Sequence, residues 1–212
     1  MDKKIIIFLD PAHTNMTPGK RSPDHSLLEF WYSREIIKRI ESKLDELGIK
    51  HWNTHPEEGW CSPNYATDSK DLQLRVKRVN AKYAECKEEG LIPILLSIHV
   101  NAAGNGCWYN ATGWSAYTTK GKTKSDNLAE CLYDAAKEIL KGKKIRTNTS
   151  DGDSDLESDF YIIKKSKCPA VLTENFFMDC QKDKEYLLSE EGKQDITNIH
   201  IKGILKYIKN YL

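Results

Sequence analysis

Residues 5–13, IIIFLDPAH, combine a continuous run of large apolar side chains with an abrupt polar ending. Consecutive apolar residues, mostly β-branched isoleucines, are typical of a strand that is buried on both faces of a sheet. Asp10 and Pro11 then end the run, and His13 follows in the expected turn. A histidine placed just beyond a buried strand is a candidate for chemistry rather than for packing alone.

Strand-like and helix-like segments alternate along the rest of the chain. This alternation, with apolar strands, predicts an α/β fold with a mainly parallel, twisted sheet covered by helices on both faces. Without an internal repeat or a long linker, residues 1–212 are expected to form a single domain. Further strands are expected at 49–54, 91–99, 113–119, 160–164 and 170–175, and helices at 29–48, 72–90, 125–142 and 195–212.

Composition excludes several classes of partner. The 32 basic and 31 acidic residues nearly balance and form no block of like charge, so we expect no nucleic-acid partner. The first apolar run is too short for a signal peptide or a membrane span, which predicts no membrane insertion. The cysteines show no metal-binding spacing and are expected to be free thiols, with a disulfide left open.

Three chemically competent residues follow apolar strands. His13 follows the first strand, His99 ends the strand at 91–99, and Glu174 lies near the end of the strand at 170–175. Because ligands of open α/β sheets bind beyond the carboxyl ends of the strands, these side chains are expected to meet. Catalytic Zn²⁺ takes three protein ligands, and Glu29, at the start of a long helix, is the candidate third ligand. Glu174 would then act as the base for a metal-activated water.

Each of these residues also has a purely structural interpretation. Ser26 and Glu29 have the spacing of a helix capping box, which the local pattern favours for Glu29. His13 is also compatible with a turn, and His99 with a hydrogen-bonded core position. Glu174 is equally placed to cap the turn that follows its strand. The residues alone leave these alternatives open.

Four motifs in this order resemble those of the zinc-dependent N-acetylmuramoyl-L-alanine amidases. The resemblance covers essentially the whole chain and implies that His13, Glu29 and His99 bind zinc while Glu174 is the catalytic carboxylate. It therefore favours metal ligation over helix capping for Glu29. The motifs are DPAH at 10–13, LQLRVKRVNA at 72–81, LLSIHVNA at 95–102 and AVLTENFFMD at 170–179, together with a glutamate before a long helix.

The resemblance implies an activity and a substrate. The expected reaction is hydrolysis of the amide between N-acetylmuramic acid and L-alanine in peptidoglycan, by a monomeric catalytic domain spanning 1–212. One alternative is a zinc carboxypeptidase or endopeptidase, whose first ligands usually form H-x-x-E, whereas Met16 stands three residues after His13 here. The other is a non-catalytic peptidoglycan-binding module, against which Glu174 argues. Asn101 and Arg75 are further candidates for holding the site or substrate.

The resemblance also has departures and open regions. Ala12 and Phe176 stand where the family commonly has glycine, which puts loop conformation and substrate fit in question. Without an evident signal peptide, we expect synthesis in the cytoplasm and action on the cell wall after release by phage-type or mother-cell lysis, or a shortened form lacking its signal.

Two loops are longer than a connection requires and carry aromatic residues. We expect a groove between these loops to bind stem peptide or sugar, with Trp108 as the best candidate. Alternatively, the rings only pin their loops to the body of the protein. The loops are 55–71 and 101–112, and their aromatic residues are Trp60, Tyr65, Trp108 and Tyr109.

Overall fold

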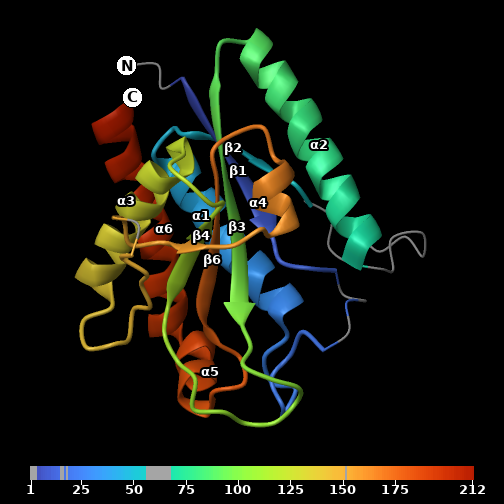
Figure 1. Cartoon of the computed structure of the whole chain (residues 1–212), viewed down its shortest axis with the longest axis vertical. Coiled ribbons are helices and arrows are strands. Elements are labelled where there is room, and N and C mark those ends of the chain that lie inside the picture. Colours follow the sequence, from blue (N-terminus) through green and yellow to red (C-terminus); the bar gives the residue numbers. More distant parts are fainter. Residues whose placement is uncertain (1–3, 15–16, 18, 56–67, 151) are drawn as a thin grey trace.

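The computed structural model describes residues 4–14, 17, 19–55, 68–150 and 152–212 (Figure 1). Helices and strands alternate along these residues, as the sequence predicts. The strands are β1 (Ile5–Pro11), β2 (Lys50–Asn53), β3 (Ile92–Asn101), β4 (Ser115–Thr118), β5 (Leu156–Glu157) and β6 (Ala170–Phe177). The helices are α1 (Glu29–Glu46), α2 (Asp68–Glu88), α3 (Lys124–Ile139), α4 (Tyr161–Lys165), α5 (Gln181–Leu188) and α6 (Glu190–Tyr211).

One six-stranded sheet organises the fold, in the order β2-β1-β3-β6-β4-β5. β1 pairs in parallel with β2 and β3, and β3 pairs in parallel with β6. β4 runs antiparallel to β6 and parallel to β5. The predicted α/β fold with a mainly parallel sheet is therefore confirmed.

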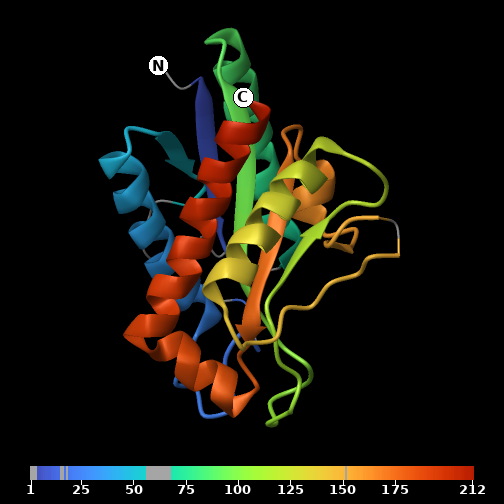
Figure 2. The ribbon, with the colours of Figure 1, turned by 90° about the vertical axis from the view of Figure 1, so that its left-hand side faces the viewer.

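Helices cover both faces of this sheet (Figures 1 and 2). Ile5, Ile7 and Leu9 of β1 join the core formed with α1, α3 and α6. Ile6 and Phe8 point to the opposite face, into the core formed with α2 and α4. Because successive strand residues face opposite sides, only an uninterrupted apolar run can supply both cores. Burial of each such side chain stabilises the fold by roughly 1.5–3 kcal/mol.

The same alternation decides which face carries the polar residues of β3 and β6. Leu95 and Leu172 belong to the core under α2 and α4. His99 and Glu174 are an even number of residues further along these strands and so lie on that face. They are also direct partners in the β3–β6 pairing. Two parallel strands thus place an imidazole beside a carboxyl group at the carboxyl edge of the sheet.

The expected strand at 160–164 is wrong, because this segment forms the short helix α4. Ile162 and Ile163 are both buried in the core shared with α2. Two consecutive residues reach one core from a helix, whereas in a strand they would point to opposite faces. Packing against α2 therefore determined the conformation of this segment, although its β-branched residues favour a strand.

Other element boundaries also differ from expectation. α6 begins at Glu190 rather than at 195, and the hydroxyl of Ser189 caps it by accepting the backbone N–H of Gly192 at 3.0 Å. The short elements α5 and β5 were not expected, since α5 is a single polar stretch of 8 residues and β5 has only 2. Gly48 has the expected role after α1, with a φ of 63° that favours glycine.

The thiols and helices bear on two further expectations. Cysteines 86, 107, 131, 168 and 180 are free thiols, as expected, and Cys61 lies outside the described residues. No helix in the described part of the chain is long and apolar enough to cross a membrane.

Candidate metal centre

His13, Glu29 and His99 meet at the carboxyl edge of the sheet. His13 Nε2 lies 3.3 Å from Glu29 Oε2, and His99 Nδ1 lies 3.1 Å from Glu29 Oε1. One ligand atom from each residue fits within 4.8 Å of the others. Among the residues that the structure describes, no other group of three His, Cys, Asp or Glu side chains has the spacing of a metal site. His13 follows β1, Glu29 begins α1 and His99 belongs to β3.

Glu29 does not cap α1, so the capping-box interpretation is wrong. The N-cap residue is Leu28, which makes no side-chain cap. The hydroxyl of Ser26 donates instead to Asp24 Oδ1 at 2.8 Å. Glu29 is 1% exposed and turns into the protein, where its Oε1 also accepts the backbone N–H of Val100 at 3.0 Å. Packing against β3 therefore decides the orientation of Glu29.

Electrostatics at the three residues favour an ionised carboxylate. Burial opposes ionisation of Glu29, but His13 and His99 outweigh burial and hold the pKa of Glu29 below its usual range. Burial lowers the pKa of His13. For His99, burial is opposed by Glu29, and the pKa lies above its usual value. One carboxylate held between two imidazoles is the oxygen and nitrogen donor set that suits Zn²⁺.

Two buried arginines hold the turn that presents His13. The turn backbone is unusual, because His13 has a φ of 52°. Its carbonyl oxygen accepts hydrogen bonds from Arg34 at 3.1 Å and from Arg75 at 2.7 Å. Arg34 also donates to the carbonyl of Ala12 at 3.0 Å, and Arg75 donates to that of Pro11. These bonds stabilise a strained turn and orient His13.

Sequence reasoning considered Arg75 but missed Arg34. Arg34 is four residues after Phe30, on the buried side of α1, where a charged side chain is unexpected. That position was the available signal. A second missed residue is Asn175, whose amide donates to the carbonyl of His99 at 2.9 Å while its oxygen accepts from the Trp114 indole at 2.9 Å. Asn101 lines the pocket next to His99.

Arg75 belongs to a buried cluster beneath the turn. Asp10 Oδ1 accepts from the hydroxyl of Thr54 at 2.6 Å and from Arg75 at 3.0 Å. Asp10 Oδ2 accepts from the hydroxyl of Ser97 at 2.7 Å. Asp71 accepts from Arg75 Nε at 2.8 Å. Burial opposes the charge of Asp10, but Arg75 and the hydroxyl groups keep the pKa of Asp10 below its ordinary value.

Glu174 lies beside the three candidate ligands, in a pocket of about 300 Å³ that we call the site pocket. Its Oε2 is buried and has no hydrogen-bond partner among the residues that the structure describes. Burial, with a contribution from the charge of Glu29, raises the pKa of Glu174 to about 8. A buried carboxyl group with an unused oxygen and a pKa near neutrality is suited to proton transfer. The structure therefore brings all four sequence-predicted site residues together.

Many of the residues that line the site pocket are apolar, and together they form what we call its apolar wall. α4 and the neighbouring strands and helices supply this wall, and one basic side chain, Lys20, also lines the pocket. The apolar lining residues are Leu72, Val100, Ala102, Phe160, Tyr161, Ile162, Leu172 and Met178.

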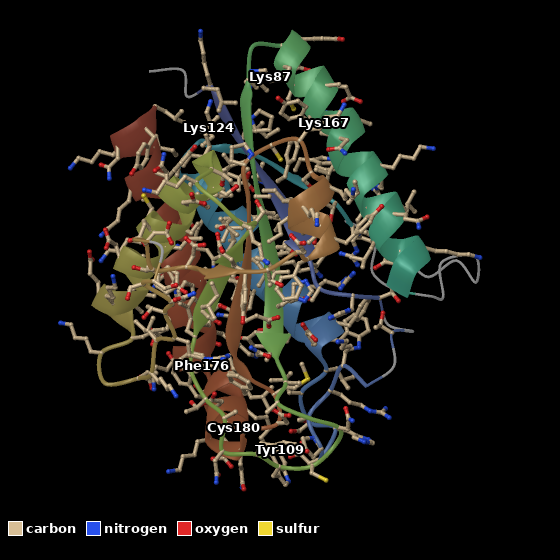
Figure 3. The ribbon with its side chains drawn as sticks, in the orientation of Figure 1. Lys87, Tyr109, Lys124, Lys167, Phe176 and Cys180 are labelled. Carbon is tan, nitrogen blue, oxygen red and sulfur yellow. The ribbon has the colours of Figure 1, made fainter. Side chains whose placement is uncertain are left out.

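The aromatic residues of the loop at 101–112 lie in a separate hollow. Trp108 and Tyr109, 42% and 40% exposed, line a space of about 650 Å³ together with the first turn of α5. Figure 3 shows Tyr109 and Cys180 together at this end of the molecule. The hollow shares no lining residue with the site pocket. The other wall expected for this groove, including Trp60 and Tyr65, lies outside the described residues.

The two aromatic residues differ in their contacts. The ring of Tyr109 covers Gly104 so closely that any side chain there would collide with it. Tyr109 therefore pins its own loop. Trp108 has the ammonium group of Lys184 at 5.5 Å from its ring centre. The expected contact between Trp108 and substrate stays a prediction.

Phe176 shows how one departure from the family pattern is accommodated. Its φ of 63° is in the left-handed region, which glycine adopts without strain. The side chain is nonetheless buried and packs edge-on against Tyr186 at 5.3 Å between ring centres. The backbone conformation that glycine favours is therefore kept, and burial of the ring offsets its strain.

Fold and site together define an α/β protein with three side chains at the carboxyl edge of its sheet that could hold a metal ion. A family model described as N-acetylmuramoyl-L-alanine amidase matches residues 7–206. The chain belongs to the N-acetylmuramoyl-L-alanine amidase family.

Individual relatives agree with this assignment. The chain is 27% identical over 197 residues to the N-acetylmuramoyl-L-alanine amidase LytC of Bacillus subtilis, covering 90% of this chain and 34% of LytC. It is 23% identical over 212 residues to the endolysin of Bacillus phage SPP1, covering 96% of this chain and 66% of the endolysin. The chain thus spans only part of these relatives.

Solved structures share the fold. An N-acetylmuramoyl-L-alanine amidase from Clostridium difficile 630 superposes with a TM-score of 0.79 at 22% identity over 98% of each chain. The CwlD amidase of Clostridioides difficile, solved in complex with the GerS lipoprotein, gives a TM-score of 0.76 at 21% identity over 96% of this chain and 98% of CwlD.

Proposed function

We propose that this chain is a zinc-dependent N-acetylmuramoyl-L-alanine amidase. In this proposal residues 1–212 form one catalytic domain, which hydrolyses the amide between N-acetylmuramic acid and L-alanine of peptidoglycan. The observation that carries the proposal is the convergence of His13, Glu29 and His99 beside the unpartnered carboxyl oxygen of Glu174. Membership of the amidase family supports the choice of bond.

The donor set supports zinc as the metal. Two imidazole nitrogens and a carboxylate oxygen are common ligands of catalytic zinc, which leaves one position open for water or substrate. The nitrogen-to-oxygen separations of 3.3 and 3.1 Å are close to the ~3.3 Å between two ligands of tetrahedral zinc. When bound, zinc supplies Lewis acidity, which polarises a carbonyl group and makes water more acidic.

The protein's own residues supply the remaining functions. Glu174 Oε2 accepts a proton from the attacking water and returns it to the nitrogen of the leaving L-alanine. The apolar wall along α4 keeps bulk water away from this exchange, which strengthens the electrostatic interactions in the pocket. Arg34 and Arg75 hold the carbonyl of His13 and so keep its imidazole facing Glu29.

The partner and the place of action follow from the same proposal. The substrate is peptidoglycan or soluble muropeptides, and the enzyme works on the cell wall as a monomer. The similarity to a phage endolysin supports action on the wall. Release by lysis fits this site of action.

Product analysis tests the reaction. The protein is incubated with purified muropeptides, and the products are identified by mass spectrometry. Free N-acetylmuramic acid ends and peptides beginning with L-alanine are expected. Cleavage within the peptide would indicate the zinc peptidase alternative, and binding without cleavage would indicate a non-catalytic module.

Metal analysis tests the ligands. We expect one zinc per chain, and His99→Ala is expected to lose it because two ligands hold a catalytic metal poorly. Zinc content is measured by elemental analysis after gel filtration. His51→Ala is the matched control, since His51 pairs with Asp45 away from the site. Full zinc content in His99→Ala would remove His99 from the site.

A further inference from the structure

Lys20 is fixed beside the candidate metal centre by its backbone. Its carbonyl oxygen accepts the N–H of Glu29 at 3.0 Å, so the two residues are held together at the start of α1. Its side chain lines the site pocket with His13 and Glu174. A positive charge therefore stands at the edge of the reaction site.

The ammonium group of Lys20 has no acidic partner among the residues that the structure describes. Two other lysines with restricted exposure are paired differently. Lys184 Nζ lies 2.9 Å from Asp24 Oδ2, and Lys193 Nζ lies 2.9 Å from Glu35 Oε1. Lys20 is also partly buried, yet no such pair accompanies it. A partly buried cation that lines a pocket and makes no close ion pair there keeps its hydrogen-bonding capacity for an anionic ligand.

The chemistry of the substrate limits what that anion can be. In a muramyl peptide, the lactyl carboxyl group of the sugar is consumed in the scissile amide, so the carboxylates lie on the peptide side. The second stem residue is within about 7 Å of the scissile bond, because two extended residues span that length. Its free carboxylate is therefore the negative group nearest to the reacting carbonyl.

We propose that Lys20 binds the free carboxylate of the second stem residue and makes the enzyme selective for acidic over amidated stem peptides. This inference rests on the proposed amidase function. Lys20 is then a specificity residue, which contacts the substrate but not the reacting atoms. The interaction is a charge-assisted hydrogen bond, which is stronger than one between neutral groups.

A matched pair of ligands tests this inference without requiring turnover. N-acetylmuramoyl-L-alanyl-D-glutamate carries the carboxylate, and its isoglutamine counterpart carries a neutral amide in its place. Binding of each to Glu174→Gln is measured by calorimetry, with and without the additional substitution Lys20→Met. We expect roughly 10-fold tighter binding of the acid, lost in the double variant, because a hydrogen bond between charged groups is stronger than one to a neutral amide.

Two further variants make the result specific. Lys20→Arg is expected to keep most of the preference, since the guanidinium group retains the charge. Lys167→Met, at an exposed lysine that does not line the pocket, removes the same charge and is expected to leave the preference intact. Equal binding of acid and amide by Glu174→Gln would overturn the inference. An equal loss for both ligands on Lys20→Met would also overturn it.

Hydrolysis separates this inference from the proposed function. If the wild-type protein binds the acid preferentially through Lys20 but cleaves neither compound, the specificity assignment stands and the amidase proposal fails. If it cleaves both with equal kcat/KM and Lys20→Met changes neither value, the amidase proposal stands and the role of Lys20 is refuted.

Discussion

Two buried polar clusters lie next to each other on the same face of the sheet, and they differ in how completely their atoms are bonded. The support cluster contains Asp10, Thr54, Asp71, Arg75 and Ser97. Both oxygens of its Asp10 accept hydrogen bonds, and its arginine is paired with two carboxylates. Asp71 Oδ1 makes no hydrogen bond among the described residues, but it has the imidazole of His55 at 3.5 Å. The site cluster contains His13, Glu29, His99 and Glu174. There Glu174 Oε2 has no hydrogen-bond partner within the described part of the chain, and the two imidazoles converge on the carboxylate of Glu29.

The difference separates a structural role from a functional one. Buried polar groups in folded proteins are nearly always hydrogen-bonded, so a group without a partner requires another explanation. Asp10 and Ser97 face each other in the β1–β3 pairing, only two residues before His99 on β3. Position in the sheet is therefore almost the same for both clusters. What distinguishes the site cluster is capacity left for a metal ion, water and substrate.

The largest expected effect concerns the unbonded oxygen of the site cluster. Glu174→Gln is expected to lower kcat by about 10²–10⁴-fold, because an amide does not accept the proton of the attacking water. Zinc content and the melting temperature are expected to stay near wild type, since that oxygen has no partner to lose. Turnover and zinc are measured on the same sample. Near-normal turnover would show that another group takes the proton.

The support cluster is expected to respond through stability. Arg75→Met leaves Asp10 and Asp71 buried without their cation, which is expected to cost about 3–5 kcal/mol in the free energy of unfolding. Urea denaturation measures this loss. Lys77→Met, at an exposed position on the same helix, is the control and is expected to change stability little. An Arg75→Met protein of normal stability would contradict the assignment of a structural role.

His200 is a buried polar residue outside both clusters, and it extends the comparison to the pH dependence of stability. His200 is bonded to Thr173 Oγ1 at 3.0 Å and to the carbonyl of Ile196 at 2.7 Å, and burial lowers the pKa of His200 to about 4. The unfolded chain binds a proton that the folded chain excludes, so the stability from this group is complete above about pH 6.5 and is lost as the pH falls toward 4. The total is roughly 3 kcal/mol.

This pH effect is measured by difference. Unfolding free energies of the wild type and of His200→Gln are compared between pH 7.5 and pH 4.5, since glutamine takes up no proton in this range. The wild type is expected to lose more stability on acidification. Parallel pH dependence of the two proteins would show that His200 is protonated equally in the folded and unfolded states.

The smallest expected effect concerns the hollow beside the site pocket. If Trp108 stacks against substrate, Trp108→Ala is expected to lower kcat/KM for intact muropeptides by roughly 2- to 10-fold, the range for one aromatic contact. A minimal muramyl dipeptide is expected to be affected less. Tyr109→Ala is the contrasting variant, because it releases the loop over Gly104 and is expected to affect both substrates alike. Unchanged kcat/KM for both substrates in Trp108→Ala would exclude this residue from binding.

Local pattern in the sequence was sufficient for the layers and for placing three of the four candidate site residues at one edge of the sheet, but it left their roles open. The run IIIFL supplies two cores only as a buried central strand, because side chains alternate between the faces of a sheet. His13, His99 and Glu174 each follow such a run, and parallel strands bring their carboxyl ends to one edge. These inferences depend on residues that are close in the sequence. The covalent geometry of a strand fixes the directions in which their side chains point.

Contacts between distant segments decided the rest. Glu29 fits a capping box in the local sequence, and only the structure places it beside His99, which is 70 residues away along the chain. The segment at 160–164 became a helix because α2 packs over it, and Arg34 acquired its role because the His13 turn lies across α1. Local sequence specifies periodicity and chain direction. Which carboxylate faces which imidazole depends on long-range packing, and therefore only the tertiary structure determined it.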